Sequence, residues 1–178
     1  MKKILKRYCV FLILVAVNIV IGLILPEIGA SSFELTKSNL TEMLCVIPPI
    51  FVLLGLLDVW VDKETMMKFL GKGSGAKGIA IAFALGAAAA GPLYAAFPVA
   101  TVMLKKGSSL FNTFIFIGAW STAKIPLLTF EAASLGLNFA ATRLLINIFG
   151  IIAIAFVVEK SLKKEEKEQV YRIAQGEI

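Results

Sequence analysis

Two cationic side chains lie inside stretches of this sequence that otherwise carry almost no charge. Lys124 lies six residues before the end of the apolar run 110–130, and Arg143 lies six residues after the start of the run 137–158. On antiparallel helices both would lie about 9 Å below the same membrane surface. A cation buried in the bilayer costs at least about 2.5–3.5 kcal/mol, so two at matching depth need a reason.

Two explanations for this pair stay open. In the first, the long stems of Lys124 and Arg143 carry their charges to the lipid headgroups and take no part in binding. In the second, both side chains face an internal cavity, are partly balanced by Glu131, and bind an anionic or polar group. Asn147, one helical turn below Arg143, would then continue the polar face inward.

The residues around Lys124 also interrupt their own helix. Trp120, Ser121 and Thr122 precede the lysine, and Pro126 follows it. Because proline has no N–H, the helical hydrogen bond to the Thr122 carbonyl is lost and that oxygen is freed. The pattern predicts a break within an apolar segment.

An earlier apolar segment, AAAAGPLYAAFPVA at 87–100, contains a similar interruption. Gly91-Pro92 and Pro98 disturb the helix on either side of Tyr94. Lipid offers no partner to the backbone groups of such a break, so the break must be buried in protein or line a wet cavity. Pairs of broken helices with polar neighbours form binding sites in transporters, and channels use them too.

The composition indicates an integral membrane protein. Of 178 residues 58% are hydrophobic and 17% charged, with a mean hydropathy of +0.87. Crossing a bilayer takes about 18 apolar residues or more, and four runs approach or exceed that length: 8–25, 43–60, 110–130 and 137–158. The net charge of +6 does not point to nucleic acid, because its distribution is better explained by membrane orientation.

The distribution of lysine and arginine predicts the topology. Four basic residues precede the first run, which we expect to be a retained helix rather than a cleaved signal peptide, with its N-terminus inside. The acidic segment 26–42 is then outside and the lysine-rich segment 62–77 inside. If the apolar region 78–104 dips in and returns, 15 basic residues lie inside and Lys37 outside, whereas a single kinked crossing puts 8 on each side. The positive-inside rule therefore favours a re-entrant hairpin, whose two halves, each about 18 Å long, are too short to span.

Other chemistries find little support in the sequence. The chain has no histidine, and Cys9 and Cys45 would lie in opposite leaflets, so we expect no disulfide, metal site or cofactor. The segment 73–78, GSGAKG, matches a nucleotide-binding pattern but follows no predicted strand. No carboxylate pair lies inside the spans, so we do not expect an enzyme. The membrane domain should cover 1–158, and the charged tail 159–178 should extend the last helix into the cytoplasm.

The order of several features is similar to that of a known family. They are Gly86, Phe97-Pro98, the turn Lys105-Lys106-Gly107-Ser108-Ser109 and the segment Ala123-Lys124-Ile125-Pro126. Residues 45–150 thereby resemble one repeat of the bacterial predicted permeases that include organoarsenical efflux permeases. Many members have a Cys-Ser-Cys element before the first proline, whereas this chain has Leu93-Tyr94-Ala95-Ala96, so the resemblance implies no thiol contact with arsenic.

Full-size members of that family have two repeats, and this chain resembles one. The resemblance therefore implies a parallel homodimer, or a heterodimer with a related half-length chain. A small-molecule solute and the lipid bilayer are the other expected partners.

We therefore expect an all-α integral membrane protein with four transmembrane helices and a re-entrant broken-helix hairpin, one repeat of a two-repeat permease. It would lie in the bacterial inner (plasma) membrane with both termini cytoplasmic and move a small polar or anionic solute, by efflux. The alternative is a channel or a non-transporting membrane scaffold subunit. The expected solute pathway comprises residues of the two breaks and the polar face beyond them: Gly91, Pro92, Tyr94, Pro98, Trp120, Ser121, Thr122, Lys124, Pro126, Arg143 and Asn147.

Overall fold

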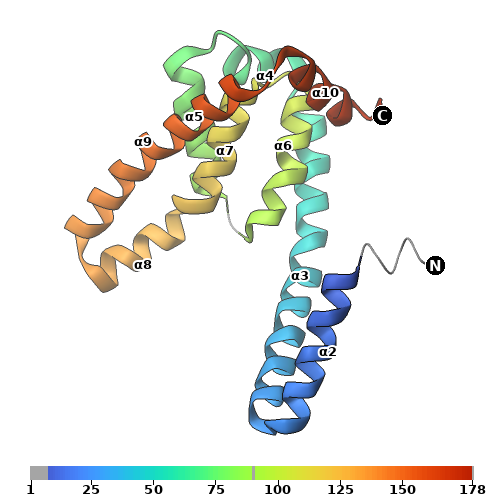
Figure 1. Cartoon of the computed structure of the whole chain (residues 1–178). Helices are drawn as coiled ribbons and strands as arrows, with labels where there is room; N and C mark the ends of the chain where they lie inside the picture. The colour runs from blue at the N-terminus through green and yellow to red at the C-terminus, as the bar shows by residue number, and fades with distance from the viewer. Residues whose placement is uncertain (1–7, 90, 178) are drawn as a thin grey trace. The chain divides into compact units, whose positions relative to one another are not determined.

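The described part of the chain is entirely helical. The computed structural model describes residues 8–89 and 91–177, apart from the side chains of 47, 53, 54, 57 and 58, and contains no strand among them (Figure 1). The chain divides into two compact units, Met1–Pro48 and Pro49–Ile178. The division falls inside helix α3 (Pro26–Trp60), between two successive prolines that lack the N–H a helix needs.

The first unit is a pair of helices, α2 (Cys9–Ile24) and the first half of α3 (Figure 1). α2 ends before Leu25, because a residue that precedes proline disfavours helical angles, and Pro26 is well suited to begin the next helix. The helices approach closely at Gly22 and Gly29, where a Cβ on Gly29 would lie 2.5 Å from the Gly22 Cα. Small residues therefore set the spacing of this pair.

Segment 26–42, expected to be an external connection before a helix over 43–60, is instead the first part of α3. Its hydroxyl side chains are satisfied within the helix, because each donates to a carbonyl one turn back: Ser31 to Glu27, Thr36 to Ser32 and Thr41 to Lys37. No proline or left-handed glycine follows Pro26 until Pro48, so nothing in the segment ends the helix.

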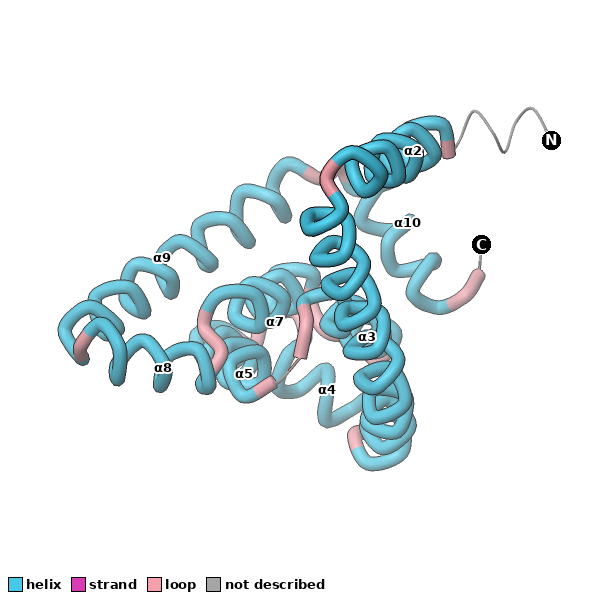
Figure 2. The backbone as a smooth tube through the Cα atoms, turned by 90° about the horizontal axis from the view of Figure 1, so that it is seen from below, coloured by secondary structure: helices cyan, strands magenta, loops and turns pink. Residues whose placement is uncertain are grey.

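The second unit is arranged around helix α7 (Leu110–Thr122). α7 contacts α5 (Gly75–Ala88), α6 (Ala96–Lys105) and α9 (Leu137–Ser161), and it lies beside α5 in both views (Figures 1 and 2). The close contact with α5 depends on Gly86, where an added Cβ would lie 2.4 Å from the Phe116 carbonyl oxygen. A short helix, α4 (Lys63–Leu70), precedes α5 and packs against it.

The first interruption separates α5 from α6. α5 ends at Ala88, Gly91 adopts a positive φ of 106°, and a 3-10 turn, η1 (Leu93–Ala95), leads into α6. α5 and α6 run in opposite directions (Figure 1). Pro98 lies in the first turn of α6, where its missing N–H breaks no helical bond, so the chain is interrupted by Gly91-Pro92 alone.

The second interruption separates α7 from α8 (Ile125–Leu135). α7 ends at Thr122, and Pro126 lies in the first turn of α8. Gly136, with φ of 91°, turns the chain into α9. Among the described residues, Leu110–Leu135 and Leu137–Ser161 are the two stretches long and apolar enough to cross a membrane.

The tail does not extend α9, contrary to the expectation for 159–178. α9 ends at Ser161, and a separate helix, α10 (Lys164–Gln175), packs against α6. Glu166 starts the new helix, because its carboxylate accepts the Lys163 backbone N–H at 2.7 Å. Ala174 of α10 is buried, and the Tyr171 hydroxyl donates to the Ser108 carbonyl at 3.1 Å. One face of the tail helix is therefore packed against other helices. Burial raises the pKa of the Tyr171 hydroxyl, which therefore stays a neutral donor.

Candidate functional site

The two interruptions meet at one backbone oxygen, the carbonyl of Gly91. The Trp120 indole Nε1 donates to it at 3.3 Å, and the Lys124 Nζ donates to it at 2.6 Å. This oxygen belongs to the break between α5 and α6, whereas both donors belong to the break between α7 and α8. Side chains of the second break therefore satisfy the backbone of the first.

Each donor is held in place by its local structure. Trp120 is 3% exposed, and its ring meets Phe116 edge to face with centroids 5.5 Å apart. Lys124 is the residue just before α8, and its backbone is extended rather than helical.

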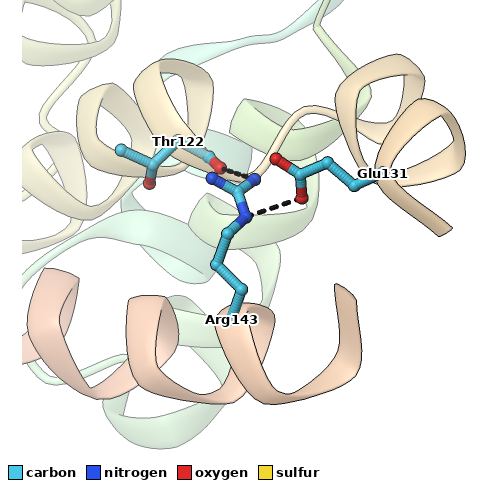
Figure 3. A network of polar contacts seen from close by, with 3 residues as sticks. All are labelled: Thr122, Glu131 and Arg143. Atoms are coloured by element: carbon cyan, nitrogen blue, oxygen red, sulfur yellow. Dashed lines mark hydrogen bonds and ion pairs between the residues drawn. The ribbon is translucent and has the colours of Figure 1, made fainter. Parts of the chain in front are cut away.

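Arg143 satisfies the second interruption in the same way. Its Nη2 donates to the Thr122 carbonyl at 2.9 Å, and its Nε forms an ion pair with the Glu131 Oε2 at 2.6 Å (Figure 3). The Thr122 carbonyl is the oxygen that Pro126 leaves without a helical donor. Three helices, α7, α8 and α9, are thus joined at one guanidinium.

Two further polar groups belong to this region. Glu131 is 9% exposed, and the sequence indicated it only as a partial balance for the cations. Asn147 lies one turn from Arg143 on α9, and its side-chain Nδ2 is buried and has no hydrogen-bond partner. A buried amide donor without an acceptor is unfavourable, so this nitrogen is suited to an acceptor supplied from outside the protein.

The remaining predicted pathway residues are less directly involved. Tyr94, Pro98, Ser121 and Pro126 are exposed, and Pro92 is half-buried. The Thr122 hydroxyl donates to the Gly118 carbonyl of its own helix at 3.0 Å. The structure therefore brings together Gly91, Trp120 and Lys124 as one group and Thr122 and Arg143 as another, connected through residues 122–124.

A second polar cluster, which sequence analysis missed, lies at the other end of α7. Asn112 is 3% exposed, and its Nδ2 donates at 2.9 Å both to the Leu70 carbonyl and to the Ser74 hydroxyl. Ser109 accepts the Asn112 backbone N–H at 3.2 Å and so caps α7. The cap, a serine three residues before Asn112, was the available signal. This cluster joins the loop after α4 to the start of α7, and the buried Lys106 lies at the same end, where its Nζ donates to the Val61 carbonyl.

Comparisons with known proteins give one match. A family model described as a predicted permease, ArsP_1, matches residues 29–177. A search of curated proteins and a search of solved structures each find no match.

The Arg143–Glu131 pair should show strong energetic coupling. We expect Arg143→Met to lower the free energy of unfolding by on the order of 3 kcal/mol, because it leaves a buried carboxylate unpaired. Adding Glu131→Gln should recover most of that loss, because no buried charge then remains. Unfolding of the purified protein in detergent measures both variants.

Arg172→Met is the matched control, because Arg172 is exposed on α10 and should change stability by less than about 0.5 kcal/mol. Additive effects in the double variant would show that the two side chains are not coupled.

Proposed function

The chain belongs to the ArsP_1 family of predicted permeases, and from this we propose that it is a membrane permease subunit that moves a small polar or anionic solute. Membership and the apolar helices support a membrane transporter rather than an enzyme. We further propose that the protein exports its solute and that it lies in the bacterial inner membrane.

The observation that carries the site is the Gly91 carbonyl with its two donors from the second break. Broken helices in transporters place backbone ends and charged side chains at the solute position. Here Lys124 and Arg143 each hold a carbonyl of a broken helix, so a solute with acceptor groups can compete for donors that already lie at the breaks. This geometry supports the cavity explanation for the two cations over the headgroup explanation.

We propose that α5 and α6 form the re-entrant hairpin and that α2, α3, α7–α8 and α9 are the four crossings. α5 and α6 run in opposite directions and, with 14 and 10 residues, are about 21 and 15 Å long, so the chain can enter the membrane through one and return to the same side through the other (Figure 1). Lys77 near the start of α5 and Lys105 at the end of α6 lie at the open end of the hairpin, which supports a cytoplasmic open end and cytoplasmic termini.

We propose a dimer as the working assembly, of two copies of this chain or of this chain and a related one. Gly78, Ala82 and Gly86 are buried, whereas a second face of small residues on α5 is exposed: Ala80, Ala84 and Ala88. Small residues let membrane helices approach closely, so this second face suits a helix of another subunit.

Cysteine labelling tests the topology in a variant whose Cys9 and Cys45 are replaced by serine. We expect Lys105→Cys and Lys164→Cys, both at exposed positions, to react with an impermeant maleimide only from the cytoplasmic side. Asn138→Cys, beside the α8–α9 turn, should react only from the opposite side. Labelling of Lys105→Cys from the outside would show that α5 and α6 together cross the membrane once and do not form a re-entrant hairpin.

Cross-linking tests the dimer in the same cysteine-free background. Ala84→Cys should give a band of twice the chain mass with a short bismaleimide, because its side chain is exposed. Ala82→Cys, on the same helix but 0% exposed, is the matched control and should not react. If none of Ala80, Ala84 and Ala88 cross-links as cysteine, α5 does not form the interface. A cross-linked band of another mass, obtained from cells that also express a related chain, would favour the heterodimer.

Solute flux tests the permease itself. Proteoliposomes are assayed with formate, methanesulfonate and nitrate, with glycerol as the neutral comparison. Lys124→Gln and Arg143→Gln should lower anion flux at least about tenfold, since a hydrogen bond to a charged group contributes about 1.5–3 kcal/mol.

Lys164→Gln and Arg172→Gln, at exposed positions of α10, are the matched controls and should keep wild-type flux. Wild-type flux in both site variants would show that Lys124 and Arg143 take no part in solute transport. Flux that rises without saturation would favour the channel alternative.

A further inference from the structure

The Arg143 guanidinium already binds an anionic group of the protein, the Glu131 carboxylate. A guanidinium has five N–H donors, and here Nε pairs with the Glu131 carboxylate while Nη2 holds the Thr122 carbonyl (Figure 3). The carboxylate lies where the carboxylate, sulfonate or phosphonate group of a solute would bind an arginine. Glu131 thus acts as a built-in competitor at this position.

Asn147 points to the same class of ligand. Its Nδ2 is buried without an acceptor and lies one turn from Arg143 on α9. A solute oxyanion that takes the place of Glu131 on Arg143 would supply that acceptor. The Glu131 carboxylate satisfies the charge of Arg143 but not the amide of Asn147.

The surroundings of Glu131 determine what happens when it is displaced. In the described part of the chain, α8 packs against α9, whose charged side chains are Arg143 and, near its far end, Glu159 and Lys160. Lys124, just before α8, is engaged with the Gly91 carbonyl. Arg143 is therefore the counter-charge of Glu131. A buried carboxylate that loses its counter-charge is strongly unfavourable, and the favourable response is to bind a proton.

We propose that an oxyanion group of the solute binds Arg143 and Asn147 by displacing Glu131, and that Glu131 takes up one proton as it leaves. The inference rests on the proposed permease function and adds to it the solute class and the link to protons. The step forms one O–H bond on Glu131 with a proton from solvent and changes no other covalent bond. Bound as a monoanion with one proton, the solute adds no net charge to the site.

The sign of the pH dependence follows from this exchange. One proton enters for each anion bound, so the anion binds more tightly as the pH falls. We consider the pH range in which Glu131 is ionised in the solute-free protein and protonated once the solute has displaced it. Over that range the affinity for the anion should change about tenfold per pH unit. A site without Glu131 has no group to exchange a proton and should bind the anion independently of pH.

The test measures anion binding to the full chain in lipid nanodiscs. Trp60→Phe leaves Trp120, which lies at the breaks, as the single fluorescent tryptophan. The probes are formate and methanesulfonate, which stay monoanions between about pH 5 and 8. The thermal unfolding midpoint gives a second measure of binding and shows whether each variant folds.

We expect wild-type affinity for the probes to fall about tenfold per pH unit as the pH rises, and that of Glu131→Gln to change less than about twofold. Glu131→Gln should bind at least as tightly as wild type at every pH, because the charged competitor is gone. Glu168→Gln, at an exposed position of α10, is the matched control and should keep the wild-type pH dependence. Arg143→Gln should lose binding.

Three results would overturn the inference: wild-type affinity that does not vary with pH, Glu131→Gln protein that folds but binds neither probe, or binding that survives Arg143→Gln. These results are separate from the permease test. If anion flux depends on Lys124 and Arg143 but not on the proton exchange, the permease proposal stands and the proposed role of Glu131 fails.

Discussion

The second unit depends on one constraint: a backbone carbonyl that a broken helix exposes in apolar surroundings must find a donor. The Gly91 carbonyl finds Lys124 and Trp120, and the Thr122 carbonyl finds Arg143. In both places the donor comes from another helix or from the other break. The interruptions are therefore stable because they are held to one another.

This constraint gives the two cations a double role. In the structure they are the partners of the exposed carbonyls, and Arg143 also holds the Glu131 carboxylate. A solute that needs their donors must compete with groups of the protein. In the proposed permease, a solute bound to Arg143 would replace the Glu131 carboxylate beside the guanidinium nitrogen that holds the Thr122 carbonyl, so binding would take place next to a helix end.

Much of the helical pattern follows from local sequence. Gly91-Pro92 and Pro126 lie where two helices are interrupted, and Gly136 lies at the turn into α9. Segment 26–42 and the course of the tail were harder. The polar segment 26–42 was expected to be an external connection, and the charged tail was expected to be a solvated continuation of the last helix. Segment 26–42 joins α3, where its hydroxyl groups are satisfied by carbonyls of the same helix. The tail forms α10, whose apolar face packs against Leu104 of α6 and Leu110 of α7, which are far away in sequence.

For the site, the residue types and the positions of the helix interruptions could be read directly from the sequence, because proline and glycine act on their own backbone. The sequence also indicated that Lys124 and Arg143 needed a reason to lie in apolar runs. The partners of these two side chains became known only from the packing of the helices. The Gly91 carbonyl, the Glu131 carboxylate and the unpaired Asn147 amide acquire their roles through contacts between helices, and such contacts depend on how α7, α8 and α9 pack rather than on spacing along the chain.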